Sequence, residues 1–238
     1  MKHNLCQIKN VTKANTTLNY LGTRPRNEMV GLGLVYGAPG LGKTRWALNA
    51  GLTKNFHVYV RLDSTETQKS FLIRLYQGLQ NVYGVVATVR GSKQKIYLDI
   101  VDILIEAPQT VVFIDEIDYA FKDKQLLGTI RDLADETLAT FILVGMQDAK
   151  NSLLKANAHY FDRCNSFCEF KPLSLEDTAL VCAEVCEVAL EPEVVKFVHR
   201  RTKGTLRRIV KALDMFERTA KSKKLKKITL ADLGSVDE

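Results

Sequence analysis

The chain has 238 residues, of which 46% are hydrophobic and 26% are charged, and its formal net charge is +7. This length suits one large α/β domain with a small appendage, and the composition is ordinary for a globular protein. No apolar run approaches the ~20 residues of a membrane helix, and the first residues lack the apolar core of a secretory signal, so we expect a cytoplasmic protein without a membrane partner.

Basic residues are concentrated toward the C-terminus. Thirteen lysines and arginines but only two acidic residues lie between Lys196 and Lys227, so this segment carries +11 and the remainder of the chain is net acidic. Such a concentration is typical of a nucleic-acid-binding surface. The alternative is a solvated helical face with a lysine-rich end.

The first expected strand, residues 34–36, leads into a glycine-rich loop and a helix that starts near residue 45. The loop fits the phosphate-binding pattern G-x-x-x-x-G-K-S/T with the residues Gly37, Ala38, Pro39, Gly40, Leu41, Gly42, Lys43 and Thr44. In this pattern backbone N–H groups and the helix N-terminus hold a polyphosphate, Lys43 reaches the β and γ phosphates, and the Thr44 hydroxyl binds Mg²⁺. We therefore predict a site for ATP with Mg²⁺.

The next expected strand, residues 58–62, alternates polar and apolar side chains. It ends at Asp63 and Ser64, which can cap a helix that runs through Phe71 and Leu79. A polar basic loop over residues 90–95 then precedes a second amphipathic helix.

Residues 111–114 form a continuous apolar run that ends in an acidic pair. A strand that is apolar on both faces belongs in the middle of a parallel sheet covered by helices. Asp115, at its end, is placed to hold the Mg²⁺ shell, and Glu116 can orient and polarise an attacking water. This pair favours ATP hydrolysis over transfer of the phosphoryl group to a metabolite, because a small-molecule kinase need not carry the adjacent glutamate.

Two further expected strands, residues 141–145 and 167–170, complete an α/β fold with a doubly wound parallel sheet. Ligands of such sheets bind beyond the carboxyl ends of the strands. The pattern then changes, because Ser174–Asp177 resembles a capping box and opens a run of helical segments. We expect three parts: an N-terminal leader over 1–29, an α/β nucleotide-binding core over 30–171, and a small all-helical lid with a basic C-terminal segment over 172–238.

These elements together resemble an AAA+ ATPase, with Walker A at 37–44 and Walker B at 113–116. Within that superfamily, several sequence runs are similar to the transposition ATPases, the family of the phage Mu transposition protein B and the transposon target-DNA regulators. These runs are Asp115–Asp118, Thr129–Leu133, Ile142–Met146, Pro172–Asp177 and Gly204–Arg208.

The resemblance implies an ATPase that oligomerises on double-stranded DNA as a helical filament or ring, marks the DNA as a target, and recruits or stimulates a transposase. Each ATP would lie between subunits. Arg163 matches the arginine finger that reaches the γ phosphate of the neighbouring subunit, and Arg207 matches the lid arginine that senses the nucleotide. The alternatives are a surface role for Arg163 and DNA contact for Arg207. In the second case Arg208 is the candidate that would take the place of Arg207.

Expected DNA contacts lie on the core and the lid, because only about 30 residues precede the first strand, where the phage Mu protein carries a DNA-binding domain. The candidate residues are Arg90, Lys93, Lys95, Arg200, Arg201, Lys203 and Arg208. Aromatic residues do not alternate with them, so we expect sequence-tolerant contacts to phosphates.

Two features leave other functions open. Many AAA+ proteins carry a polar sensor after the fourth strand, whereas here Met146 follows Gly145 and Gln147 is the nearest polar candidate. Slow hydrolysis is therefore expected, and the resemblance implies that DNA stimulates it. A weakly hydrolysing ATP switch or scaffold is one alternative. A replication-initiator or helicase-loader ATPase is another, and a metabolic P-loop kinase is the third.

Overall fold

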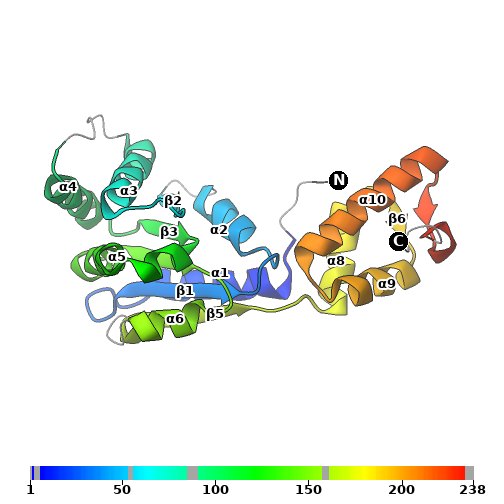
Figure 1. Cartoon of the computed structure of the whole chain (residues 1–238), viewed down its shortest axis with the longest axis horizontal. Helices are drawn as coiled ribbons and strands as arrows, with labels where there is room; N and C mark the ends of the chain where they lie inside the picture. The colour runs from blue at the N-terminus through cyan, green and yellow to red at the C-terminus, as the bar shows by residue number, and fades with distance from the viewer. Residues whose placement is uncertain (1, 3–5, 53–55, 85–90, 157–160, 234–238) are drawn as a thin grey trace. The chain divides into compact units, whose positions relative to one another are not determined.

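The computed structural model describes residues 2, 6–52, 56–84, 91–156 and 161–233, which form two compact units (Figure 1). We call residues 14–38 and 43–169 the core unit, and residues 1–13, 39–42 and 170–238 the helical unit. Helix α1 (Lys9–Gly22) begins in the helical unit and ends in the core unit. Within the described ranges, no helix combines the length and the apolar character needed to cross a bilayer.

The core unit is built on a five-stranded sheet with the strand order β2-β3-β4-β1-β5. The strands are β1 (Gly31–Gly37), β2 (His57–Arg61), β3 (Val111–Asp115), β4 (Thr140–Val144) and β5 (Cys164–Phe170). The pairs β1/β4, β3/β4 and β2/β3 are parallel, and every residue of β3 and β4 is buried. The predicted fold, a parallel sheet flanked by helices, is confirmed.

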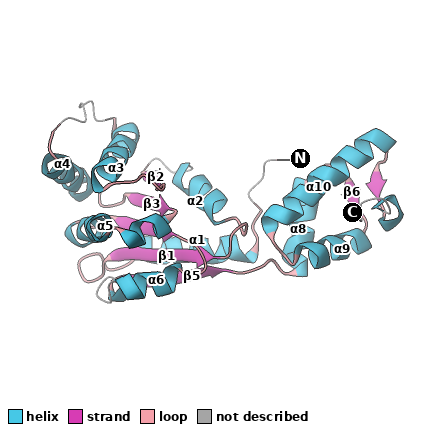
Figure 2. Cartoon of the chain, in the orientation of Figure 1, coloured by secondary structure: helices cyan, strands magenta, loops and turns pink. Residues whose placement is uncertain are grey.

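Helices cover this sheet (Figure 2). Helix α2 packs on β2 and β3, α3 packs on β2, and α4 packs on α3. The helical elements of the core unit after β1 are α2 (Lys43–Leu52), α3 (Gln68–Tyr83), α4 (Lys93–Glu106), the 3₁₀ turn η1 (Ile117–Lys122), α5 (Lys124–Glu136) and α6 (Ala149–Ala156).

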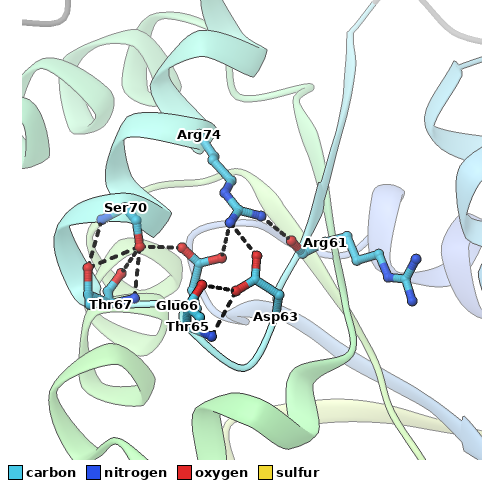
Figure 3. A network of polar contacts seen from close by, with 7 residues as sticks. All are labelled: Arg61, Asp63, Thr65, Glu66, Thr67, Ser70 and Arg74. Carbon is cyan, nitrogen blue, oxygen red and sulfur yellow. Dashed lines mark hydrogen bonds and ion pairs between the residues drawn. The ribbon is translucent and has the colours of Figure 1, made fainter.

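The start of α3 differs from the expected cap at Asp63 or Ser64. Thr67 is the N-cap, and it forms a reciprocal capping box with Ser70. Asp63 instead accepts a hydrogen bond from Arg74, which lowers the pKa of that carboxyl. Figure 3 shows Arg74 at the centre of this network, where it also donates to the Arg61 carbonyl over 2.8 Å. Through these two bonds Arg74 fixes the end of β2. Asp63 is engaged at the end of the strand and does not cap the helix.

The basic segment before α4 also differs from the expected loop. Ser92 is the N-cap of α4 and accepts from the Lys95 N–H, so Lys93 and Lys95 lie in the first helical turn. A serine followed by residues with good helix propensity is sufficient to start the helix earlier. Arg90, the third basic residue expected here, lies outside the described residues.

The helical unit contains α8 (Leu175–Val185), α9 (Pro192–Thr202) and α10 (Leu206–Lys223), followed by the 3₁₀ turn η2 (Leu230–Leu233). Ser174 caps α8 in the predicted capping box with Asp177. The unit is not entirely helical, however, because β6 (Ala189–Leu190) pairs in parallel with β7 (Lys227–Ile228). Helix α8 ends before this small sheet, and Ile228 of β7 is fully buried.

A buried arginine joins the end of α1 to the beginning of the sheet. The Arg24 guanidinium, 5% exposed, donates to the carbonyls of Leu21, Leu138 and Ala139 and to the Thr140 hydroxyl. Burial lowers the pKa of Arg24 to about 10, so the group stays charged at neutral pH and needs all these acceptors.

Gly31 is required beside this arginine. A Cβ atom at Gly31 would lie 2.3 Å from Arg24 Nη2 and 2.5 Å from the Ala139 carbonyl oxygen. We predict that Gly31→Ala lowers the free energy of unfolding by about 1–3 kcal/mol, the usual cost of overpacking, as measured by urea denaturation.

Gly128 in α5 provides the matched control. Nothing lies within 4 Å of a Cβ at that position. Gly128→Ala should therefore stabilise the protein by about 0.5–1 kcal/mol, since alanine favours a helix interior. Equal effects of the two substitutions would contradict the role given to the Gly31 contacts.

Candidate active site

The side chain of Lys43 lies folded against the loop that precedes it. Its Nζ donates to the carbonyl oxygens of Gly37, at 2.6 Å, and Ala38, at 3.0 Å, and the residue is 8% exposed. Gly37 ends β1 and Lys43 begins α2, so the two elements hold the ammonium group at the carboxyl edge of the sheet. A phosphate oxygen is a stronger, charged acceptor for this ammonium group than either carbonyl.

Asp115 lies at the same edge, at the end of β3, and is 2% exposed. Its Oδ2 accepts from the Tyr59 hydroxyl over 2.7 Å, and its Oδ1 accepts from the Glu116 N–H over 2.9 Å. Asp115 and the exposed residue Thr44 both belong to the core unit and offer hard oxygen donors. This donor chemistry fits Mg²⁺.

Glu116 has a strained backbone. Its φ is 58° and its ψ is 42°, the left-handed conformation that L residues other than asparagine and aspartate rarely adopt. Its Oε1 lies 3.3 Å from Arg61 Nη2 in an ion pair whose side chains are 28% and 61% exposed. Such an exposed pair contributes at most about 1 kcal/mol, so it holds the carboxylate while allowing it to exchange partners.

The end of β4 lies between β1 and β3 and is fixed by an acidic side chain. The Gly145 N–H donates to the Val35 carbonyl, and the Met146 N–H donates to Asp118 Oδ2 over 2.8 Å. Burial raises the pKa of the Asp118 carboxyl above its ordinary value. Gln147 is the polar residue expected to serve as the sensor after β4. Its Nε2 lies 3.3 Å from a carboxylate oxygen of Glu169.

The tip of the phosphate-binding loop, residues 39–42, belongs to the helical unit together with the start of α10. The Arg207 N–H donates to the Gly40 carbonyl over 2.9 Å. Gly40 and Gly42 have φ values of 81° and 98°, and a Cβ on Gly42 would lie 2.8 Å from Leu206 Cδ2. The loop therefore needs these glycines for its turn and for close approach to α10, and the backbone of Arg207 lies beside the loop tip.

Arg163 lies immediately before β5 and is paired within its own chain. Its Nε is 2.7 Å from the carboxylate of Asp135 in α5. The Arg163 side chain is 42% exposed, so the ion pair lies at the surface of the core unit.

The expected DNA-contact residues fall into two groups. In the core unit, Lys93 donates to Gln68 over 2.9 Å, and Lys95 pairs with Asp99 over 3.2 Å. In the helical unit, the candidates Arg200, Arg201, Lys203 and Arg208 are all exposed around the turn that joins α9 to α10. All four lie within residues 200–208, at the end of α9 and the start of α10.

Three residues that no local sequence pattern singles out hold the groups at this edge of the sheet. Tyr59 bonds Asp115, Arg61 pairs with Glu116, and Asp118 accepts from the N–H that follows β4. Tyr59 and Arg61 are two residues apart on β2, so they face the same side of the sheet. Their alternation is visible in the sequence. What is not visible is that β2 lies next to β3, because local patterns do not determine strand order.

The model of the AAA domain family matches residues 27–153, which is more than half of the chain. A search of curated proteins finds no match in sequence.

Several solved structures have a similar fold. The ORC2 protein of Aeropyrum pernix, in ADPNP-ADP complexes, has a TM-score of 0.68 at 15% identity, covering 98% of this chain and 69% of that one. The ORC1 protein of the same organism, in complex with DNA, has a TM-score of 0.65 at 17% identity, covering 98% and 65%. The RuvB Holliday junction branch migration motor of Thermotoga maritima has a TM-score of 0.61 at 18% identity, covering 95% and 69%. The chain thus spans about two thirds of the length of each, and these identities establish the shared fold alone.

The backbone strain at Glu116 can be measured separately from the loss of its side chain. Glu116→Gly and Glu116→Ala both remove the carboxylate and its ion pair with Arg61, but only glycine adopts the left-handed conformation without cost. We predict that Glu116→Gly is more stable than Glu116→Ala by about 1 kcal/mol in urea denaturation.

Lys122, an exposed residue of η1 with an ordinary backbone, is the control position. There the order should reverse, with Lys122→Ala more stable than Lys122→Gly. If the alanine variant is more stable than the glycine variant at both positions, the backbone of Glu116 is unstrained.

Proposed function

Because this chain belongs to the AAA domain family, we propose that it is a cytoplasmic, DNA-directed ATPase of the replication-initiator or helicase-loader type. The observation that carries the proposal is the arrangement at one edge of the core sheet. The Lys43 ammonium group donates to the carbonyls of Gly37 and Ala38 at the end of β1, Asp115 ends β3, and Glu116 follows it. The fold similarity to the ORC proteins agrees with the initiator type.

The proposed reaction is hydrolysis of the γ phosphoanhydride bond of ATP. Lys43 leaves the loop carbonyls and binds the β and γ phosphates, while the N–H groups of the loop and of the first turn of α2 hold the remaining oxygens. Thr44 and Asp115 hold Mg²⁺, which supplies charge neutralisation on the phosphates. Glu116 orients and polarises the attacking water when its carboxylate is released from Arg61.

The proposed enzyme works as an oligomer, either a filament or a ring, with ATP between subunits. Arg163 is the proposed finger toward the γ phosphate of the neighbouring subunit. Arg207, whose backbone lies beside Gly40, is the proposed nucleotide sensor. In this proposal residues 30–171 form the nucleotide-binding core and 172–238 the lid, after a leader over 1–29.

Double-stranded DNA is the proposed partner. The basic residues around the α9–α10 turn support this assignment, because lysine and arginine side chains there are exposed to solvent and can reach phosphates. The similar ORC1 protein was solved in complex with DNA, which agrees with the assignment. Lys93 and Lys95, with Arg90, form the second proposed contact region.

A second candidate function is regulation of transposition, with a transposase as the partner. It is supported by the sequence runs of the transposition ATPases, among them Asp115–Asp118 and Gly204–Arg208. Both functions use the same site and differ in the protein partner. Capture of a replicative helicase rather than a transposase by the DNA-bound protein in ATP would decide between them.

Nucleotide chemistry is tested by substitutions in the site. We predict that Lys43→Ala abolishes ATP binding, because the phosphates lose their cation, and that Glu116→Gln binds ATP but loses nearly all turnover, with or without double-stranded DNA. ATP binding is followed by calorimetry, turnover by phosphate release, and assembly by electron microscopy in a non-hydrolysable ATP analogue.

The control for these variants is Lys155→Ala, an exposed lysine of α6 in the same unit. It should behave like the wild type. Wild-type turnover in Glu116→Gln would remove the water-activating role from Glu116, and unchanged ATP binding in Lys43→Ala would remove the phosphate site.

DNA binding is tested by charge reversal at the α9–α10 turn. Arg200→Glu/Arg201→Glu should weaken binding to a random-sequence duplex at least tenfold. A DNA phosphate that loses its contact with an arginine keeps its bound counterion, so binding no longer gains from the release of that ion. The slope of log K against log salt concentration should become shallower by about 0.9 for each such phosphate. Fluorescence anisotropy over a salt series measures both quantities.

The charge-matched control is Lys122→Glu/Lys155→Glu, which changes the net charge equally at exposed positions of the core unit. It should leave the salt slope unchanged. Arg90→Glu/Lys93→Glu tests the second contact region in the same way. If all three double variants bind the duplex with the same affinity and the same salt slope, the basic residues are only a solvated surface.

A further inference from the structure

Both oxygens of the Asp115 carboxylate already accept a hydrogen bond within the chain. Tyr59 donates its hydroxyl to Oδ2 and the Glu116 backbone donates to Oδ1, over 2.7 and 2.9 Å. A carboxylate has about four acceptor positions, two on each oxygen. One position on each oxygen therefore remains for a further ligand, and the plane of the carboxylate is set by the two bonds already made.

The strand register explains how Tyr59 reaches this carboxylate. Tyr59 is opposite Phe113 on the neighbouring strand, and Arg61 is opposite Asp115. Tyr59 and Asp115 are thus diagonal neighbours on adjacent strands, a separation that a long aromatic side chain spans. Helix α2 packs against the same tyrosine, where a Cβ atom on Gly51 would lie 3.1 Å from Tyr59 Cβ and 3.5 Å from the Phe113 ring. Strand and helix together leave the phenol little freedom to turn away.

The direction of the hydrogen bond follows from the chemistry of the two groups. A phenolic hydroxyl carries a proton to donate, whereas an ionised carboxylate can only accept. Tyr59 therefore donates through its hydroxyl, and Asp115 Oδ2 accepts. A tyrosine at this place thus restrains one oxygen of the side chain beside which a divalent cation is expected.

We propose that Tyr59 is a positioning residue for the divalent cation, which acts by holding the Asp115 carboxylate in the orientation that binds the cation and its water shell. This inference rests on the ATPase function proposed above. Hydrogen-bond partners of metal-binding side chains typically change metal affinity or activity by about 10–100-fold when they are removed. The competing role is structural, in which the hydroxyl only satisfies a buried carboxylate.

The test is Tyr59→Phe, which removes the hydroxyl and keeps the ring that packs against α2. Mn²⁺ affinity is measured by electron paramagnetic resonance in a non-hydrolysable ATP analogue, and the Mg²⁺ dependence of turnover is measured with ATP. We expect Mn²⁺ binding to weaken about tenfold or more and the Mg²⁺ midpoint of turnover to rise by a similar factor. Binding of the nucleotide without metal should stay close to that of the wild type.

The matched control is Tyr83→Phe. The Tyr83 hydroxyl also makes a hydrogen bond in the core unit, 2.6 Å from Thr110 Oγ1, but Thr110 precedes β3 at the opposite end of the strand from Asp115. This variant removes a comparable tyrosine hydrogen bond, so it reports the structural cost alone. Its Mn²⁺ affinity should equal that of the wild type.

A double-mutant cycle with Asp115→Asn separates an effect of Tyr59 through Asp115 from a general effect of the substitution on the protein. If Tyr59 acts through Asp115, Tyr59→Phe should produce no further change in Mn²⁺ affinity in the Asp115→Asn background. Unchanged Mn²⁺ affinity in folded Tyr59→Phe, or an equal loss in Tyr83→Phe, would overturn the inference. Failure of the wild-type protein to bind Mn²⁺ with the nucleotide would instead refute the proposed ATPase function.

Discussion

The parallel register of β1, β4 and β3 is the constraint on which the candidate site depends. Val35 pairs with Val144, and Val144 pairs with Asp115, so the ends of the three strands are aligned. A shift of one residue would turn every side chain of a strand to the opposite face of the sheet. Because β3 and β4 are buried at every position, such a shift would place side chains of the wrong size and shape in the packing on both faces. The core therefore determines where the end of β1 lies relative to Asp115.

The same edge of the sheet carries groups that individually oppose folding. Lys43 is a largely buried cation, Asp118 is a carboxyl whose pKa is raised by burial, and Glu116 has a left-handed backbone. Each costs free energy that the apolar strands must offset. Costs of this kind cluster where a ligand is bound or a reaction takes place, and a polyphosphate would give Lys43 a charged acceptor in place of neutral carbonyls.

The sequence predicts those features that depend on neighbouring residues. The glycine-rich loop, the buried strands β3 and β4 and the capping box at Ser174 all follow from local patterns, and they are present in the structure. The expected N-cap of α3 is wrong because Arg74 recruits Asp63 into another network. The roles of Tyr59 and Arg61 escape prediction for a different reason, since they depend on β2 lying beside β3. Strand order is a property of the whole sheet and leaves no pattern in one segment.

The ion pair between Arg163 and Asp135 is compatible with the proposed role of Arg163 in a neighbouring subunit's site. Both side chains remain partly exposed, at 42% and 24%, and ion pairs of this kind contribute only about 0.2–1 kcal/mol. In the proposed assembly, a γ phosphate closed off from water would bind Arg163 more strongly than Asp135 does, so the exchange of partners would be favourable. Meanwhile Asp135 restricts the guanidinium of the unassembled protein, which reduces the entropy that assembly must remove. The carboxylate thus keeps Arg163 ordered without competing strongly against the phosphate.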